Sequence, residues 1–251
     1  MSGKFLKNYL LYSENYYLQE IMNLEEEIQL ELKSRGADFV YFVDISQLPA
    51  EQNKNYSNAI LIGITLSPEY LKEISDTPDF VLNMISNNQI NEDEFDLKEK
   101  KADYLADYIA NFLSLKGFYT YSQSEDNLSL SGFYDEKTKN TLLPHKTIAL
   151  LAGLGWIGKH NLLVSPDFGS AFCMCTVLTD APFRTVINSL SIPKCGNCII
   201  CSNICSVDAI KGKTWNITVP RDEMVDVYKC TCCLRCLVFC PWTQSYMNKN
   251  I

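Results

Sequence analysis

The spacing of the cysteines is the feature that most constrains this chain. All eleven lie after residue 172, and nine fall between Cys195 and Cys240. A secreted protein stapled by disulfides would spread its cysteines through its loops, whereas a dense cluster in a reducing compartment is typical of metal binding. The remaining two, Cys173 and Cys175, stand two apart in a strand-like run and share one face of it. We interpret them as small buried hydrophobic residues.

The clustered cysteines repeat one spacing twice. The first run is Cys195, Cys198, Cys201 and Cys205, and the second is Cys230, Cys233, Cys236 and Cys240. Bacterial two-cluster ferredoxins use this spacing, in which three thiolates of one run hold a 4Fe–4S cluster and the fourth reaches across to the other cluster. The sequence therefore predicts two metal sites with these ligands: Cys195, Cys198, Cys201 and Cys240 for the first cluster, and Cys230, Cys233, Cys236 and Cys205 for the second.

Structural zinc is the alternative for these runs. Zinc sites usually combine paired Cys-x2-Cys units separated by a longer loop, rather than three closely spaced cysteines closed by a fourth. The pattern therefore favours iron–sulfur clusters. Cys232 is an extra cysteine inside the second run. Because Cys230 already has the spacing of a ligand, we interpret Cys232 as a bystander.

The residues that precede the cysteine runs predict an α/β core. The 251 residues are 47% hydrophobic, which is enough for one large domain or for a core domain with a small appendage. We expect an α/β domain over residues 1–190 and a ferredoxin-like module with little core of its own over residues 191–251.

Hydrophobic periodicity places the main elements of the core. Helices are expected from Ser13 to Gly36, from Ser67 onward, from about residue 92 to 116, and from Pro144 to the following glycines. Strands are expected over residues 39–43, 59–64, 118–121, 162–164 and 171–178. Residues 59–64 form a continuous apolar run, which is typical of a strand buried on both faces.

Charge is unevenly distributed along the chain. The formal net charge is −8, with 13 basic and 24 acidic residues in 1–150 but 9 basic and 6 acidic residues in 151–251. This acidic balance argues against extensive nucleic-acid binding. No apolar run reaches the roughly 18 residues of a membrane span, and the first residues do not resemble a signal peptide. We therefore expect a cytoplasmic protein without membrane contact.

A glycine-rich segment matches a dinucleotide-binding pattern. Gly153, Gly155 and Gly158 follow G-x-G-x-x-G, with an aspartate about twenty residues further on. The context differs from that motif, because a helix starting at Pro144 precedes the glycines and Pro166 follows before a crossover helix has room to form. The glycines are better explained by a tight turn or by the close approach of another ligand.

The second half of the chain resembles the epoxyqueuosine reductase family. The resemblance lies in Leu143–Lys159, in Leu162–Ser170, in Val177–Asp180, and in Cys240 with the Pro-Trp that follows it. It covers roughly residues 143–251 strongly and the rest only in general terms. Related patterns occur in corrinoid reductive dehalogenases.

This resemblance implies a fold and a cofactor. Such proteins bind cobalamin in an α/β domain similar to the nitroreductase fold, beside a two-cluster ferredoxin module that passes electrons to the cobalt. The loop 153–159 and the stretch to residue 170, with the residues flanking the loop, would then line a cofactor pocket. The candidate residues are His145, Lys146, Gly153, Gly155, Trp156, Gly158, Lys159, Gly169 and Ser170. His160 is the second histidine beside this loop.

The expected function is that of an iron–sulfur reductase with an external electron donor, such as a ferredoxin or flavodoxin, and a small-molecule or nucleoside substrate. Two alternatives are an electron-transfer protein without a corrinoid and a short form of tRNA epoxyqueuosine reductase. The family's helical-repeat domain is not expected, because eleven residues follow Cys240. The family's Gly-Arg-Asp-Tyr-His motif has only a two-letter echo at Asp103 and Tyr104, which we interpret as a coincidence.

Overall fold

The computed structural model describes residues 3–185 and 188–250, and the side chains of residues 19–185 and 188–249. A four-stranded sheet lies at its centre, in the order β1 (Phe39–Asp44), β2 (Asn58–Thr65), β8 (Phe172–Thr179) and β3 (Thr120–Ser122). All three strand pairings are antiparallel. The expected mixture of helices and strands is confirmed, and the strand pairing is that of an α+β arrangement.

The apolar run predicted for a buried strand is β2. Ile60, Ile62 and Ile64 contribute to a hydrophobic cluster that includes the long helix α5 (Glu94–Leu115). Ala59 and Leu61 contribute to a separate cluster that includes α7 (His145–Leu151). Alternate residues of a strand point to opposite faces. Because both faces of β2 meet a hydrophobic cluster, the strand is apolar throughout, although it pairs antiparallel with both neighbours.

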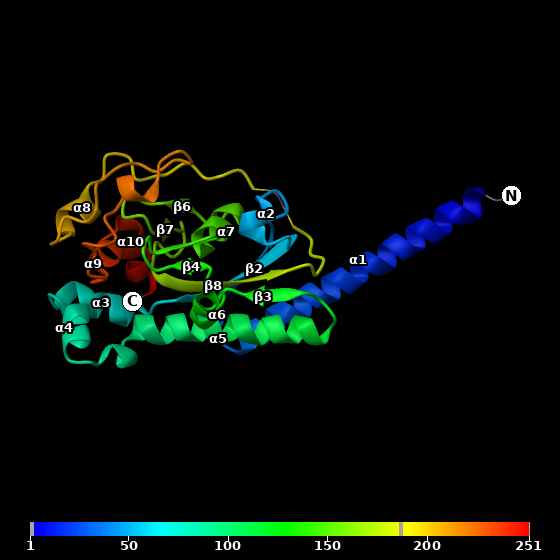
Figure 1. Cartoon of the computed structure of the whole chain (residues 1–251), viewed down its shortest axis with the longest axis horizontal. Coiled ribbons are helices and arrows are strands. Elements are labelled where there is room, and N and C mark those ends of the chain that lie inside the picture. Colours follow the sequence, from blue (N-terminus) through cyan, green and yellow to red (C-terminus); the bar gives the residue numbers. More distant parts are fainter. Residues whose placement is uncertain (1–2, 186–187, 251) are drawn as a thin grey trace.

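Two long helices belong to one face of the sheet (Figure 1). The first, α1 (Gly3–Ser34), begins earlier than expected, so Ser13 lies inside it and does not begin it. The second, α5 (Glu94–Leu115), starts at the N-cap Asp93 and is followed by Gly117 with a φ of +94°. Ala102, Leu105 and Ile109 face inward as the pattern predicts.

Shorter elements complete the part of the chain that precedes the cysteine runs. Ser67 caps α3 (Pro68–Asp76), as predicted, and accepts a hydrogen bond from the Tyr70 amide at 3.2 Å. The other elements of this part are α2 (Ala50–Asn53), α4 (Phe80–Ser86), η1 (Ile90–Glu92), α6 (Glu125–Leu130), β4 (Tyr134–Asp135), β5 (Asn140–Thr141), β6 (Trp156–Ile157) and β7 (Leu163–Val164). None of the helices in the described residues is long and apolar enough to cross a membrane.

The glycine-rich segment forms a hairpin, not a dinucleotide-binding unit. Helix α7 precedes it, and β6 pairs antiparallel with β7 directly after it. A Cβ on Gly155 would lie 1.9 Å from the carbonyl oxygen of Val164. A Cβ on Gly169 would lie 2.3 Å from the amide nitrogen of Thr243. These two glycines therefore allow close backbone contacts within the protein.

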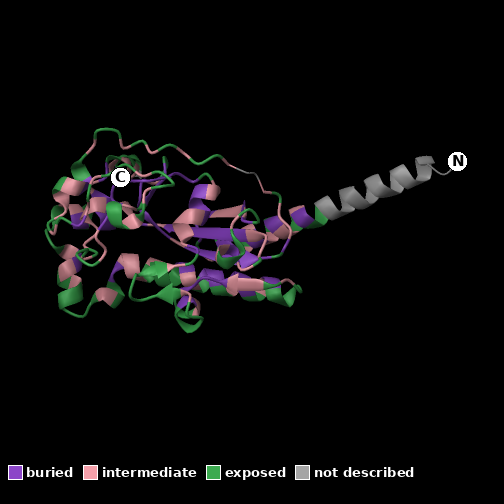
Figure 2. Cartoon of the chain, turned by 45° about the horizontal axis from the view of Figure 1, so that its top comes forward, coloured by how far each residue is buried: buried purple, intermediate pink, exposed green. Residues whose placement is uncertain are grey.

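The cysteine-rich segment begins within an irregular stretch, residues 188–199. It contains α8 (Ile200–Ile204), η2 (Arg221–Glu223), α9 (Arg235–Val238) and α10 (Pro241–Asn250). Leu237, Val238 and Met247 share a hydrophobic cluster with Tyr70 and Leu71 of α3. Most residues of β2 and β8 are buried, whereas burial in the cysteine-rich segment is more mixed (Figure 2). The last helices are thus attached to the core domain through a common apolar cluster.

Replacing Gly155 with alanine should destabilise the protein because the new methyl group meets backbone that cannot move aside. We expect Gly155→Ala to lower the free energy of unfolding by about 3 kcal/mol. Gly132 also has a positive φ, of +68°, but has open space around its Cβ position. Gly132→Ala should therefore cost only about 1 kcal/mol, from its left-handed backbone. If chemical denaturation showed equal losses of unfolding free energy in Gly155→Ala and Gly132→Ala, the close packing of Gly155 against Val164 would be contradicted.

Candidate metal centre

Cysteines from both runs line one small cavity at the surface of the cysteine-rich segment. The cavity has a volume of about 160 Å³. Three of its cysteines come from the first run and surround the start of α8, and the fourth directly precedes α10. Its cysteines are Cys195, Cys198, Cys201 and Cys240. The structure thus brings together the four residues predicted as ligands of the first cluster.

A second, larger cavity of about 440 Å³ collects the remaining cysteines. Three predicted ligands from the second run line it, together with Cys205 from the end of the first run. The full set of cysteines around it is Cys205, Cys230, Cys232, Cys233 and Cys236. The last cysteine of each run therefore faces the cavity of the other run, which is the crossed arrangement that the spacing predicts.

The surroundings of these sulfur atoms combine burial with several hydrogen-bond donors. The Ala209 amide donates a hydrogen bond to Sγ of Cys205 at 3.3 Å. Burial raises the pKa of the Cys240 thiol to about 11, while amide hydrogen bonds from Trp242 and Thr243 act in the opposite direction. The buried Thr231 hydroxyl has no hydrogen-bond partner among the described residues and lines the second cavity. Such donors stabilise thiolate and sulfide in cluster sites.

Within the described residues, no three His, Cys, Asp or Glu side chains converge on a point where a single metal ion would sit. The cysteines instead surround spaces of 160 and 440 Å³. A cubane cluster keeps its cysteine sulfurs apart by its own width, so its ligands ring a cavity. The donor set of both cavities, four predicted thiolates each, therefore fits a 4Fe–4S cluster.

Cys232 lies closer to the second cavity than its interpretation as a bystander implies. It lines that cavity and has a left-handed φ of +54°. A hydrogen bond from the Cys232 thiol to Cys230 lowers the pKa of Cys230 to about 6 and raises that of Cys232. Cys230, and not Cys232, has the ligand spacing of the run.

The second cavity extends beyond its cysteines into an apolar chamber. Helices α4 and η1 contribute Val81, Ile85 and Ile90, and the first turns of α5 contribute Phe95 and three carboxylates. These carboxylates are Asp93, Asp96 and Glu99. No local sequence motif marks this chamber.

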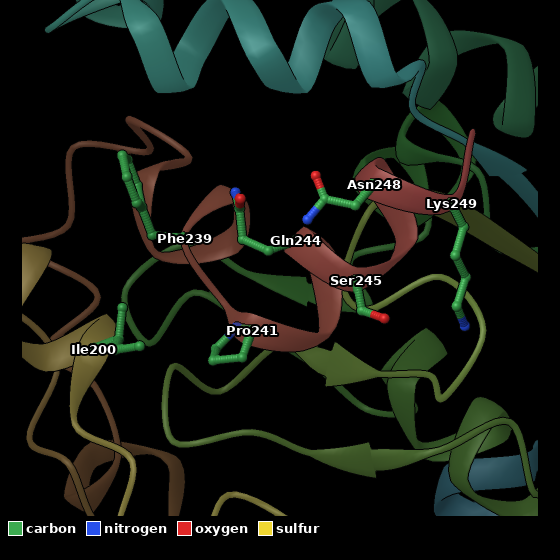
Figure 3. Close-up of a pocket in the computed structure, with 7 residues that line it drawn as sticks. All are labelled: Ile200, Phe239, Pro241, Gln244, Ser245, Asn248 and Lys249. Atoms are coloured by element: carbon green, nitrogen blue, oxygen red, sulfur yellow. The ribbon is translucent and has the colours of Figure 1, made fainter. Parts of the chain in front are cut away.

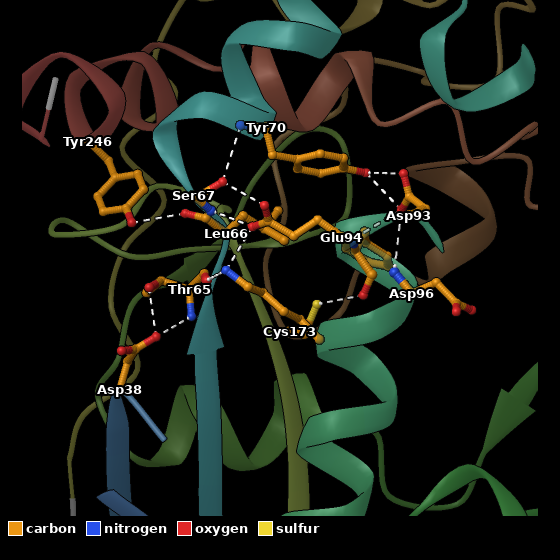
Figure 4. Close-up of polar contacts among 12 residues, drawn as sticks. Asp38, Thr65, Leu66, Ser67, Tyr70, Asp93, Glu94, Asp96, Cys173 and Tyr246 are labelled. Atoms are coloured by element: carbon orange, nitrogen blue, oxygen red, sulfur yellow. Dashed lines mark hydrogen bonds and ion pairs between the residues drawn. The ribbon is translucent and has the colours of Figure 1, made fainter. Parts of the chain in front are cut away.

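Hydrogen bonds fix the start of α5 at the chamber (Figure 4). Asp93 is buried, accepts the amide of Phe95 at 3.0 Å, and accepts the Tyr70 hydroxyl at 2.8 Å. Glu94 accepts the Ser67 amide and hydroxyl, both at 2.6 Å, and pairs with Lys98 at 2.7 Å. These contacts tie the first turn of α5 to the start of α3.

Glu99 has the electrostatic setting of a proton donor. Glu99 is exposed to solvent, and partial desolvation, followed by repulsion from Asp103, Glu125, Asp96 and Asp93, raises its pKa to about 7. A carboxyl group with such a pKa is partly protonated at neutral pH, which is the condition for general acid–base work.

Two of the predicted cofactor residues, His145 and Lys146, make polar contacts within the core domain. His145 contacts the Thr176 hydroxyl with Nδ1 at 2.9 Å, and burial lowers the pKa of His145 to about 4. Lys146 donates to the side-chain oxygen of Asn161 at 3.1 Å, and burial lowers its pKa to about 8. Both side chains are engaged by neighbouring parts of the core domain.

The remaining loop residues have packing contacts of their own. Trp156 is 1% exposed and lies edge-on to Trp242, with ring centroids 4.9 Å apart. The Ser170 hydroxyl donates to the carbonyl of Leu163 at 2.7 Å, and its amide donates to the Thr243 hydroxyl at 3.0 Å. A Cβ on Gly153 would meet the Asn188 side chain, and one on Gly158 would meet the ring of His160.

Lys159 and His160 are the loop residues that reach the candidate metal centre. Lys159 is buried and donates to the carbonyl oxygens of Gly196 at 2.8 Å and Cys198 at 3.0 Å. His160 lines both cavities, and its Nδ1 accepts the Leu162 amide at 3.1 Å, so Nε2 carries the proton in the neutral ring. Burial lowers the pKa of His160 to about 4. The loop therefore supports the first cysteine run.

Cys173, Cys175 and Asp103, which the sequence analysis also considered, lie within the core domain. Cys173 and Cys175 are 3% and 0% exposed, which confirms their interpretation as buried residues. Asp103 accepts the amide of Glu125 at 3.0 Å, at the start of α6. That contact gives Asp103 a role in joining α5 to α6.

Comparisons of sequence place this chain near epoxyqueuosine reductases. It is 35% identical over 65 residues to the epoxyqueuosine reductase of Yersinia pestis, a match that covers 26% of this chain and 15% of that protein. It is 30% identical over 114 residues to the one from Xanthomonas campestris, covering 39% and 32%. The matched region is thus a third or less of these curated relatives. No family model matches the chain.

Comparisons of structure extend the likeness to most of the chain. A crystal structure of an epoxyqueuosine reductase aligns with a TM-score of 0.56 at 14% identity, covering 90% of this chain and 67% of the other. A catabolic reductive dehalogenase aligns with a TM-score of 0.57 at 20% identity, covering 83% and 30%. At such identities the alignments show a shared fold.

One aligned structure is an epoxyqueuosine reductase with an epoxyqueuosine-modified tRNA stem loop, at a TM-score of 0.55 and 15% identity, covering 90% of this chain and 67% of that one. The expectation that acidic composition argues against extensive nucleic-acid binding is at odds with this finding. The net charge of −8 describes the chain as a whole and not the more basic cysteine-rich half. The resemblance predicted from the sequence is confirmed: the curated relatives matched are epoxyqueuosine reductases, and the fold is shared with these enzymes and with reductive dehalogenases.

Proposed function

We propose that this protein is an iron–sulfur reductase in which two 4Fe–4S clusters deliver electrons to a molecule held beside α5. The observation that carries the proposal is the crossed pair of cavities, each lined by three cysteines of one run and the last cysteine of the other. The clusters would supply one-electron transfer, and the nitroreductase-like domain of residues 1–190 would hold the acceptor beside the module of residues 191–251.

The chamber beyond the second set of cysteines is the proposed acceptor site. The second cavity is nearly three times as large as the first, although each would hold one cluster. Its extra space has an apolar wall and three carboxylates, so it suits a small molecule with an apolar body and a neutral or cationic polar end. An electron-transfer protein would not require this chamber, which favours a reductase.

Glu99 is the proposed proton donor for the reduction. An electron pair added to a bound acceptor must be matched by protons, and Glu99 lines the chamber with a pKa near neutrality. Asp93 is held by the Tyr70 hydroxyl and the first amides of α5, which gives it the role of positioning this turn.

Cobalamin is the acceptor that the resemblance implies. The residues expected to hold it are instead engaged by the hairpin, by Asn161 and by Thr176. Cobalamin is therefore the acceptor proposed on the resemblance, with no described cavity assigned to it. A titration of the cluster-loaded protein with cobalamin, followed by absorbance, tests this conclusion.

A short-form tRNA epoxyqueuosine reductase is the second candidate function, and the curated relatives favour it. It requires a basic surface around the acceptor site. Arg235 and three carboxylates line the chamber, so its own charge is acidic. Binding of an epoxyqueuosine-modified stem loop to the holoprotein, with an unmodified stem loop as the control, tests this function.

Lys159 should stabilise the first cluster more than the second. Lys159→Met keeps the length of the side chain but removes the hydrogen bonds to the Gly196 and Cys198 carbonyls. Loss of the first cluster to an iron chelator, followed by EPR, should become about tenfold faster. Lys194→Met is the matched control, because Lys194 lines the same cavity with its Nζ 5.4 Å from the Trp156 ring centroid. Equal effects of the two variants would contradict this role.

Serine variants of the last cysteine in each run test the crossed ligation. Cys205→Ser should perturb the second cluster, and Cys240→Ser the first, because each side chain lines the cavity of the opposite run. Cys232→Ser should leave the iron content unchanged. EPR spectra of the reduced proteins distinguish the clusters. Damage confined to the run that contains the mutated residue would rule out the crossing.

Glu99 should make stability depend on pH. Its folded-state pKa is raised to about 7, so the ionised form is disfavoured in the folded protein. The advantage of the protonated form is fully present below the ordinary glutamate pKa of about 4.3 and is lost as pH rises through 7. Relative to Glu99→Gln, the wild-type protein should therefore lose stability between about pH 4.5 and pH 7. A difference in unfolding free energy between wild type and Glu99→Gln that stays constant over this pH range would contradict the prediction.

A further inference from the structure

A surface groove runs along α10 beside the first cavity (Figure 3). Ile200, Phe239 and Pro241 line one part of it, and Ser245 and Lys249 line the part along α10. Pro241 also lines the first cavity, and Ile200 directly precedes the predicted ligand Cys201. The groove therefore leads from the protein surface to the first metal site.

The groove differs in charge from the rest of the protein. Residues 191–251 contain seven basic and four acidic residues, whereas residues 1–190 contain 15 basic and 26 acidic ones. Lys249 is the charged residue among those that line the groove, and the exposed Lys194 lines the adjoining cavity. No carboxylate lines either space in the described part of the chain. An acidic partner would meet complementary charge here.

Two exposed aliphatic side chains belong to the first cysteine run. Ile199 is 55% exposed and Ile200 is 42% exposed, and both lie between the ligands Cys198 and Cys201. An apolar centre beside basic side chains is the composition of a transient protein interface, in which charge guides association and apolar contact completes it.

We propose that this groove, defined by Ile200, Phe239, Pro241, Ser245 and Lys249, is the docking surface for a small acidic one-electron carrier protein. The inference rests on the proposed function, because it assigns an electron donor to the first of the two clusters. In the transfer the carrier is oxidised by one electron and the first cluster is reduced by one. The second cluster then passes electrons to the chamber.

Docking of the acidic carrier at the second cluster would conflict with the charge of the chamber. Asp93, Asp96 and Glu99 line the space beside the second set of cysteines, and they would repel an acidic protein. The two metal sites therefore have different surroundings: the first faces a basic surface groove and the second faces an acidic interior space. This asymmetry gives the electron path a direction.

A charge-reversal variant tests the docking surface. Ser245→Glu/Lys249→Glu adds negative charge to one face of α10, on two exposed residues that line the groove and not the cluster cavity. Reduction of the cluster-loaded protein by a reduced acidic 2Fe–2S ferredoxin is measured by stopped flow at low salt. Reduction by methyl viologen radical, a small cationic reductant, gives the reference rate.

The ratio of the ferredoxin rate to the viologen rate should fall about tenfold in this variant, and the wild-type ratio should fall as salt is added. Lys101→Glu/Ser114→Glu is the matched control, since both residues are exposed on α5 and neither lines the groove. The control should keep the wild-type ratio. An unchanged ratio in the groove variant, or an equal fall in the control, would overturn the docking surface alone. Absence of clusters in the loaded protein would overturn the proposed function with it.

Discussion

The crossing of the two cysteine runs is the constraint on which the rest of this structure depends. Each candidate cluster site needs one thiolate from the far end of the other run, so the two sites can form only if both runs fold against each other. The intervening chain has little regular structure, and short elements such as α8 and α9 carry the ligands. Metal binding would supply much of the free energy that orders such a segment.

The core domain contributes the surroundings of these sites. The hairpin β6–β7 places Lys159 against the carbonyls of the first run and His160 between the two cavities. Helix α5, fixed at Asp93 by Tyr70, forms the wall of the chamber beside the second site. The same sheet therefore positions a support for one site and a substrate space for the other. A substrate space beside the second site distinguishes a candidate reductase from a simple electron carrier.

The grouping of the cysteines around two cavities and the main elements could be predicted because they depend on local patterns. The cysteine spacing indicates which sulfurs share a site, and the caps at Ser67 and the glycine after α5 follow from short-range chemistry. The chamber could not be predicted, because Val81, Ile90 and Glu99 come from different elements and meet only in the fold. The glycine loop was assigned to a cofactor from its resemblance alone, whereas the close contacts of Gly155 and Gly169 depend on the backbone of Val164 and Thr243.

The most direct test of the central claim is anaerobic iron and sulfide analysis of the full chain, combined with EPR of its reduced form. Two crossed cubane sites predict about eight irons and eight sulfides per chain, with signals from two clusters close enough to interact. Stoichiometric zinc, or about four irons with a single isolated cluster, would contradict the double-cluster reductase proposed here.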